Sequence, residues 1–217
     1  MEKKNKKMLI WGACSITAFV LWTVLVCFVD VKAIGPLESR VGFATLNGWF
    51  HAHTGVNMFL YTLTDWLGLI PIAIAFGFAV FGLVQRFQRK SLLKVDRSLL
   101  ALGGFYIAVM AIYILFEIVV INYRPVLING HLEASYPSST TMLVLCVMST
   151  SIMQLHARIT HMILKRCVRS VILVFMAFTV ISRLLSGVHW FSDIVGGILV
   201  SAGLIMIYCS ISGSKSN

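Results

Sequence analysis

Long apolar runs separated by short polar segments organise the whole chain. The first run, from Met8 to Val29, has 22 residues without a charged side chain, which is enough to cross about 30 Å of hydrocarbon as a helix. Five further runs follow it. The pattern therefore predicts six membrane-spanning helices, over residues 8–29, 56–85, 98–122, 138–155, 170–186 and 189–211.

The second run is long enough for its helix to be tilted or to contain an interfacial turn, and Pro71 marks a candidate kink. Asp65, in the outer half of this run, is interpreted as a helix-packing residue, with an ion pair to an arginine as the alternative. Residues 31–55 predict an outer loop with a short amphipathic stretch, whose Trp49, Phe50, His51 and His53 suit the headgroup level.

Composition agrees with this pattern. Hydrophobic residues make up 59% of the chain and charged residues 12%, with a mean hydropathy of +0.90, which excludes an ordinary water-soluble domain. A cleavable signal peptide is the competing interpretation of the first run, but the run is long and similar runs follow it. We expect an all-α integral membrane protein with a single membrane domain over residues 1–217, in which 1–55 form the first helix and outer loop and 56–211 form the core.

The basic residues indicate the orientation. A net charge of +10 can signal nucleic acid binding, but here the basic residues lie between apolar runs, so no nucleic acid partner is expected. With the N-terminus inside, 14 of the 18 Lys and Arg residues fall on inner segments, and the outer face keeps Lys32, Arg40, Arg124 and Arg183. Positive charge accumulates on the cytoplasmic side. We therefore predict cytoplasmic termini in a bacterial plasma membrane.

Three polar segments meet on the outer side in this topology: residues 122–125, 133–140 and 182–193. In the third, the i, i+4 spacing of His189 and Asp193 places them one above the other on a helix that begins near His189. A carboxylate that holds one ring nitrogen leaves the other as an oriented nucleophile or base. The alternative is an interfacial histidine beside a helix-capping aspartate.

Arg124 and Arg183 suggest what such a histidine would attack. The planar guanidinium group matches the oxygens of a phosphate ester, and Ser138 and Ser139 open the fourth run with hydroxyls and free N–H groups at a positive helix end. Ordinary explanations also exist, because interfacial arginines snorkel and Pro-Ser-Ser is a common helix start.

The segment SRLLSGVHWFSD resembles the third motif of the type 2 phosphatidic acid phosphatase (PAP2) and vanadium haloperoxidase superfamily: Ser-Arg, five residues, His, three residues, Asp. NYRP resembles the end of that family's first motif, and YPSST resembles its second. The likeness extends over about residues 56–211 and would make them a phosphatase-like core. It implies a lipid phosphatase that acts on an isoprenoid or glycerolipid phosphate or diphosphate at the outer face, among membrane lipids and without a cofactor.

By position, the resemblance implies a phosphohistidine mechanism without a metal. His189 would attack phosphorus and Asp193 would orient it. Arg124, Arg183 and the amides near Ser138 and Ser139 would hold the phosphate oxygens, and water would release the phosphate.

Two positions depart from the family pattern. Glu117 replaces the lysine of the first motif; it either braces an arginine, since Glu117, Ile121 and Arg124 share a face of a helix, or packs between helices. Thr140 replaces the general-acid histidine of the second motif, and a hydroxyl is a poor proton donor.

Three compensations for Thr140 are open: His131 moves in, Glu133 acts as the acid, or the substrate is a diphosphate whose leaving group needs less protonation. A different function is the alternative to all three. The chain would then be either a catalytically weakened or inactive relative that binds or translocates phospholipid, or a transferase that passes the phosphoryl group to an acceptor other than water.

Overall fold

The architecture comes from a computed structural model that describes residues 2–91 and 94–212. Within these residues, six helical stretches are long and apolar enough to cross a membrane, which confirms the six predicted runs and the all-helical class. The elements follow the order α1 (Glu2–Phe28), β1 (Lys32–Ala33), a 3-10 turn η1 (Pro36–Glu38), β2 (Arg40–Val41), α2 (Ala44–Thr54), α3 (Met58–Leu67), α4 (Leu69–Arg89), α5 (Arg97–Ile118), α6 (Ser139–Arg158), α7 (Met162–Leu185) and α8 (Phe191–Ser212).

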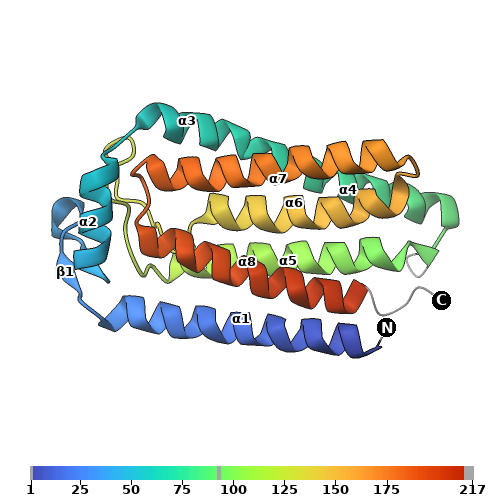
Figure 1. The fold of residues 1–217 in the computed structure, drawn as a ribbon, viewed down its shortest axis with the longest axis horizontal. Helices are drawn as coiled ribbons and strands as arrows, with labels where there is room; N and C mark the ends of the chain where they lie inside the picture. The colour runs from blue at the N-terminus through green and yellow to red at the C-terminus, as the bar shows by residue number, and fades with distance from the viewer. Residues whose placement is uncertain (1, 92–93, 213–217) are drawn as a thin grey trace.

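Helices α6 and α8 form the centre of the bundle. Figure 1 shows α6 between α7 and α5, with α8 beside it and α1 packed along the far side of α8. Small residues allow these helices to approach closely. At Gly203, for example, an added Cβ atom would lie 2.6 Å from Cδ1 of Ile16. Helix α1 is therefore packed directly against the helix that carries Asp193.

The second spanning stretch contains a break, which is one of the two alternatives that its length left open. Helices α3 and α4 are separated by Gly68, whose N–H donates to the carbonyl groups of Thr64 and Asp65. Pro71 has no N–H to continue the hydrogen-bond ladder three residues later. The break and the proline together leave α3 as a short helix at the end of the bundle.

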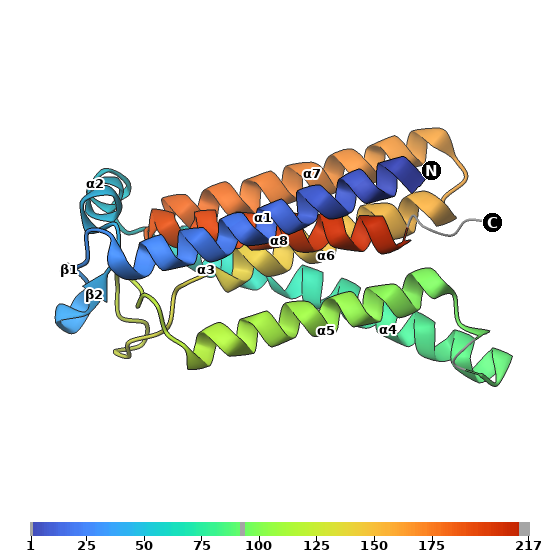
Figure 2. The same ribbon diagram turned by 90° about the horizontal axis from the view of Figure 1, so that it is seen from below.

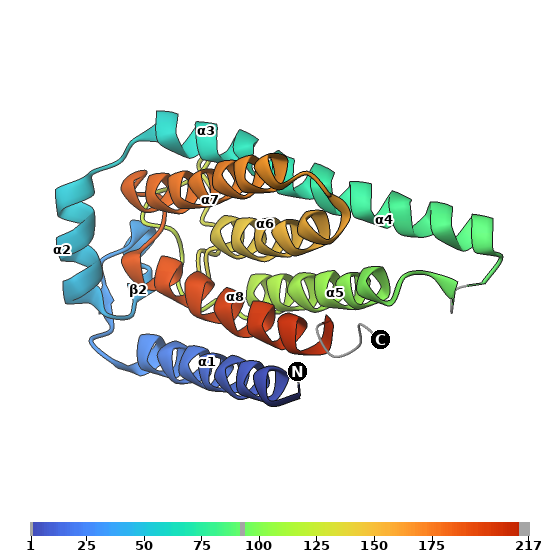
Figure 3. The same cartoon turned by 45° about the vertical axis from the view of Figure 1, so that its right-hand side comes forward.

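Helix α2 crosses that same end. Figures 1 and 3 show α2 and the β1–β2 hairpin there, whereas α1 begins and α8 ends at the opposite end (Figure 2). The predicted amphipathic stretch is thus a helix, and an even number of spans returns the chain to its starting side. Which of the two ends faces the cytoplasm stays a prediction.

Two predicted helix boundaries were wrong in ways that affect the polar segments. Helix α5 ends at Ile118, so residues 119–138 form a long loop that includes the NYRP segment. Helix α8 begins at Phe191, so His189 lies in the loop before it. The polar residues of both segments form hydrogen bonds with other parts of the chain. These bonds take the place of the backbone bonds that one more helical turn would form.

Candidate active site

Two loops bring Arg124 and His189 into contact. Arg124 lies on the loop between α5 and α6, where its N–H donates to the carbonyl of Glu133 at 3.0 Å and Tyr123 pairs with Ala134 in a β-bridge. His189 lies on the loop between α7 and α8. Nη1 of Arg124 is 3.1 Å from Nε2 of His189, and both side chains are buried. A guanidinium group therefore faces one nitrogen of the imidazole ring.

The other ring nitrogen faces Asp193. Nδ1 of His189 lies 3.8 Å from Oδ2 of Asp193, which is longer than a hydrogen bond. The carboxylate itself accepts hydrogen bonds from the N–H of Trp190 at 2.9 Å and from Nδ2 of Asn122 at 3.1 Å. Asp193 thus binds the backbone at the start of α8, as the capping alternative expects, and also faces the histidine.

The position of His189 depends on a tight loop. Gly187 has φ +66°, and an added Cβ atom would lie 1.8 Å from the carbonyl oxygen of Gly55. The N–H of Asn57 donates to the carbonyl of Ser186 at 2.9 Å. This loop is therefore packed against the segment that joins α2 to α3.

Arg183 lies behind the same site and is almost completely buried. Its Nη1 donates to Oγ1 of Thr64 at 3.1 Å and to the carbonyl of Tyr61 at 3.3 Å, and its Nη2 lies 3.7 Å from Oδ1 of Asp65. The Tyr61 ring stacks against both guanidinium groups, at 4.8 Å for Arg183 and 5.9 Å for Arg124. The alternative interpretation of Asp65, an ion pair with an arginine, is the one that the structure contains.

Arg124 has its own carboxylate, and this residue is Glu133. Nε of Arg124 lies 3.0 Å from Oε2 of Glu133. Of the two interpretations of Glu117, the structure does not contain the bracing of Arg124, because α5 ends at Ile118 and the two residues do not share a helix. Glu117 is exposed at the end of α5, beside Tyr113 and Pro137.

Ser138 is engaged in local structure. Its N–H donates to the carbonyl of Asp193 at 3.0 Å, and its hydroxyl accepts a hydrogen bond from the N–H of Thr141 as the N-cap of α6. The N–H groups of Ser139 and Thr140 belong to the first turn of α6, where no intrahelical acceptor is available. The predicted amide contribution at this helix end therefore falls to Ser139 and Thr140, not to Ser138.

Among the residues that the structure describes, His131 does not contact the arginines, His189 or Asp193. It is exposed, and its backbone pairs with Ile128 in the loop between α5 and α6. In the described part of the chain, its side chain has no hydrogen bond or ion pair with the arginines, His189 or Asp193. The structure thus brings Glu133 to the site but not His131.

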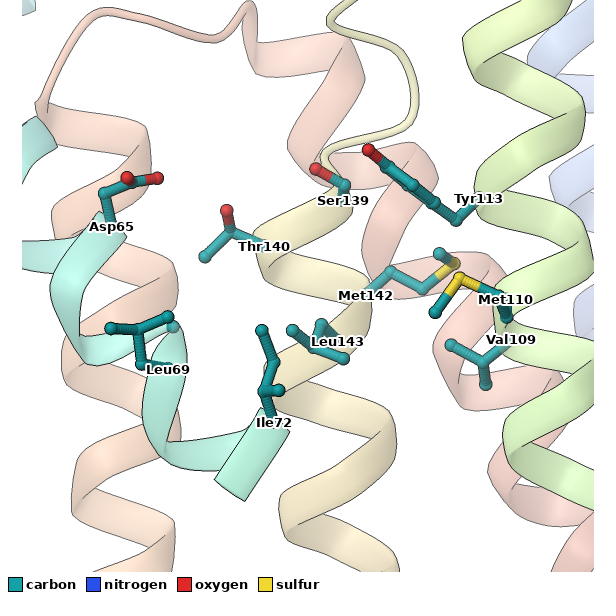
Figure 4. Close-up of a pocket in the computed structure, with 11 residues that line it drawn as sticks. Asp65, Leu69, Ile72, Val109, Met110, Tyr113, Ser139, Thr140, Met142 and Leu143 are labelled. Atoms are coloured by element: carbon teal, nitrogen blue, oxygen red, sulfur yellow. The ribbon is translucent and has the colours of Figure 1, made fainter. Parts of the chain in front are cut away.

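A cavity of about 410 Å³ lies on the side of the bundle, and one of its lining residues is Asp65, the ion-pair partner of Arg183. Its walls come from α3, α4, α5 and α6, and Figure 4 shows the oxygen atoms of Asp65, Ser139, Thr140 and Tyr113 at one end of it. Leu69, Ile72 and Met110 line the rest, and all three are exposed on the bundle surface. The cavity is therefore polar at the end that contains Asp65 and apolar along the rest of its length.

The surroundings of His189 favour its neutral form. Burial lowers the pKa of His189 well below its ordinary value, and the positive charges of Arg124 and Arg183 lower it further. A neutral imidazole keeps a lone pair on one nitrogen. The site therefore combines a candidate nucleophile with two guanidinium groups that can hold an anion.

Several contacts of the site were not anticipated from the sequence. Asn122 and Asn47 are buried, and Nδ2 of Asn47 donates to Oγ of Ser192 at 2.9 Å. Tyr61 and Thr64 contact Arg183 across more than one hundred positions of sequence. The one local signal was their place on the helix of Asp65, with Thr64 directly before it and Tyr61 one turn before it.

Residues 119–215 match the family described as the PAP2 superfamily. A solved structure, described as the crystal structure of the first transmembrane PAP2 type phosphatidylglycerolphosphate phosphatase from Bacillus subtilis, is similar over 94% of this chain and 98% of that one. The TM-score is 0.53 and the sequence identity is 17%, so the likeness is one of fold. No curated protein matches the sequence.

Proposed function

We propose that this chain is a member of the PAP2 superfamily, whose family model matches residues 119–215, and that it is a membrane lipid phosphatase that hydrolyses a lipid phosphate or diphosphate at the outer membrane face. The observation that carries this proposal is the contact between Nη1 of Arg124 and Nε2 of His189, beside the buried guanidinium group of Arg183. A nucleophile and two cationic groups then converge on one point, which is what phosphoryl transfer requires.

His189 is the proposed nucleophile. Its neutral ring attacks phosphorus through Nε2, and a phosphohistidine forms. The guanidinium group of Arg124 moves from the ring nitrogen to a phosphate oxygen, and Arg183 binds a second oxygen. Asp193, which faces Nδ1 at 3.8 Å, stabilises the positive charge that the ring gains. Water then hydrolyses the phosphohistidine, so the chemistry needs no metal.

The lateral cavity supports a lipid as the substrate. Its polar end adjoins Arg183 through Asp65, and its apolar walls open on the side of the bundle. A phosphate headgroup at the arginines would place an isoprenoid or acyl chain along Leu69, Ile72 and Met110. The solved relative is described as a phosphatidylglycerolphosphate phosphatase, which makes glycerolipid phosphates the first substrates to test.

The test is phosphate release by the purified chain in detergent, from a panel of isoprenoid and glycerolipid monophosphates and diphosphates. We expect release from at least one lipid, and His189→Gln should reduce it by about 10⁴-fold or more, because loss of a nucleophile usually has an effect of that size. His53→Gln is the matched control, since His53 is exposed on α2 and bonds to the carbonyl of Trp49.

A phosphoenzyme trap tests the mechanism independently. Wild type that is quenched with base during turnover of a ³²P-labelled substrate should retain label that acid removes, and His189→Gln should retain none. Binding of lipid phosphates without any release would favour the alternative function, a relative that binds or translocates phospholipid. In that case the replacements at Thr140 and Glu117 would mark lost chemistry.

A further inference from the structure

We propose that Asp65 donates the proton to the leaving group of the substrate. The inference rests on the proposed phosphatase function and gives the donor that Thr140, with its hydroxyl, does not supply. It is drawn from the position of Asp65 at the junction of two features: the arginine pair that would hold phosphate and the cavity that would hold the lipid chain.

The location of the leaving group follows from these two features. Phosphorus must lie within reach of Nε2 of His189 and of the guanidinium groups of Arg124 and Arg183. The lipid chain lies in the lateral cavity. The ester oxygen that joins them must then lie between the arginines and the cavity, where Asp65 lines the cavity and pairs with Arg183, and a proton donor has to face this point.

Four oxygen-bearing side chains line that end of the cavity: Asp65, Ser139, Thr140 and Tyr113 (Figure 4). Three of them are hydroxyls, which are poor acids near neutral pH. Asp65 is the one carboxyl group among the residues that line this cavity. It lies on α3, and Figure 4 shows its oxygens and the hydroxyl of Thr140 at the same end of the cavity.

The other donors that the sequence suggested are less well placed. Glu133 does not line the cavity, and its carboxylate is held at 3.0 Å from Nε of Arg124, on the opposite arginine from Asp65. His131 is exposed on the loop between α5 and α6. Neither residue faces the point at which the lipid chain would join the phosphate.

Asp65 is also free enough to change partners. Its Oδ1 lies 3.7 Å from Nη2 of Arg183, beyond hydrogen-bond distance, and its side chain is 62% exposed. A phosphate dianion bound to Arg183 would neutralise that cation and repel the carboxylate. The carboxyl group of Asp65 can therefore turn from Arg183 toward the leaving oxygen when phosphate occupies the arginine.

The reaction then proceeds in two steps. Nε2 of His189 forms a bond to phosphorus as the ester P–O bond breaks, and the bond's electron pair stays on the leaving oxygen, which takes the proton from Asp65. The neutral lipid alcohol departs and Asp65 becomes a carboxylate. In the second step this carboxylate takes a proton from the water that attacks phosphorus, which releases phosphate and restores both side chains.

The experiment compares two substrates that share a phosphoryl group but differ in the need for an acid. A long-chain alkyl phosphate has a basic leaving group, whereas p-nitrophenyl phosphate has a weakly basic one. For Asp65→Asn, which keeps the shape of the side chain, we expect the rate of the first step to fall by about 10²- to 10⁴-fold with the alkyl phosphate. The burst of p-nitrophenol should fall by less than about tenfold.

Glu133→Gln is the matched control, because it removes the carboxylate from the other arginine and should affect the two substrates by the same factor. Thr140→His in the Asp65→Asn background should restore hydrolysis of the alkyl phosphate. A burst of p-nitrophenol from Asp65→Asn also demonstrates that the variant is folded and that its nucleophile is intact.

An equal loss of rate on both substrates would overturn the role of Asp65 as an acid and would assign it to the positioning of Arg183. No loss of rate on either substrate would also overturn it. Hydrolysis of diphosphates alone, unchanged by Asp65→Asn, would overturn it as well. Failure of the wild type to release phosphate from any substrate is a separate result, and it would refute the proposed function.

Discussion

Among single residues, His189 should make the stability of the protein depend on pH. Burial and two nearby guanidinium groups hold the pKa of His189 well below the ordinary value, whereas the pKa in the unfolded chain is about 6.5. Below that pH the unfolded state binds a proton that the folded state does not, so the free energy of unfolding falls as the pH falls. We expect the thermal midpoint in detergent to drop between about pH 7.5 and about pH 5.5, and less steeply in His189→Gln.

The exposed His131 provides the control for this measurement. His131→Gln should keep the wild-type slope of midpoint against pH. Burial also lowers the pKa of His51, so the double variant His51→Gln, His189→Gln should give a flatter profile than either single variant. Identical slopes for wild type and His189→Gln would contradict the depressed pKa.

Asn122 is a second residue whose removal should be measurable. Its side chain donates to Oδ1 of Asp193 at 3.1 Å and accepts from the N–H of Gly42 at 3.3 Å, and it is buried. Asn122→Ala removes these bonds from Oδ1 of Asp193 and from the N–H of Gly42, and an unsatisfied buried group usually costs about 1–3 kcal/mol. We expect a lower thermal midpoint and weaker phosphate release, with Asn5→Ala at the opposite end of the bundle as the control. An unchanged midpoint would mean that water replaces the amide.

Three of the candidate site residues that the sequence suggested come from one local motif. Arg183, His189 and Asp193 occur within a dozen positions, so their spacing alone brings them near one another. Tyr61, Thr64 and Asn47 could not be found in this way, because their partners lie on other helices and helix packing decides which ones meet. Glu117 shows the same limit, since its assigned partner depended on a helix that ends at Ile118.

Among the elements, the loop between α7 and α8 is the one most sensitive to substitution. Gly187→Ala places a side chain at φ +66°, which costs about 1–2 kcal/mol, and its Cβ atom would overlap the carbonyl oxygen of Gly55 at 1.8 Å. The loop must then shift, and His189 shifts with it. We expect a large fall in phosphate release and a lower thermal midpoint.

Gly77→Ala is the matched control for that substitution. Gly77 lies within α4, and an added Cβ atom would have no neighbour within 4 Å. Alanine favours a helix over glycine by up to about 1 kcal/mol, so this variant should retain its activity and melt at the wild-type temperature or slightly above. Equal behaviour of the two variants would show that the α7–α8 loop tolerates movement.

Helix boundaries illustrate what hydropathy does and does not determine. The apolar run continues through Val119, Val120 and Ile121, which is why a helix to residue 122 was predicted. The helix ends earlier because Asn122 bonds to Asp193 and because the residue before Pro125 is disfavoured in a helix. The number of spans depends on total apolar length, which the sequence contains, whereas the ends depend on tertiary partners.

For the whole molecule, the remaining prediction is orientation. The site, α2 and the loop of residues 119–138 lie at one end of the bundle, and α1 begins at the other (Figure 1). Of the 17 Lys and Arg residues that the structure describes, 13 fall on the segments at the end where α1 begins, so the positive-inside tendency predicts that the site faces outward. Two exposed histidines, His131 and His161, mark the loops at the two ends.

Cysteine labelling of intact cells would measure this orientation directly. In a background with the native cysteines replaced by serine, His131→Cys should react with a membrane-impermeant maleimide and His161→Cys should react only after the cells are permeabilised. Both positions are exposed loop residues, so a difference in reactivity reports sidedness and not burial. The reverse pattern would place the site in the cytoplasm, and the lipid phosphates offered to the enzyme would then have to come from the inner leaflet.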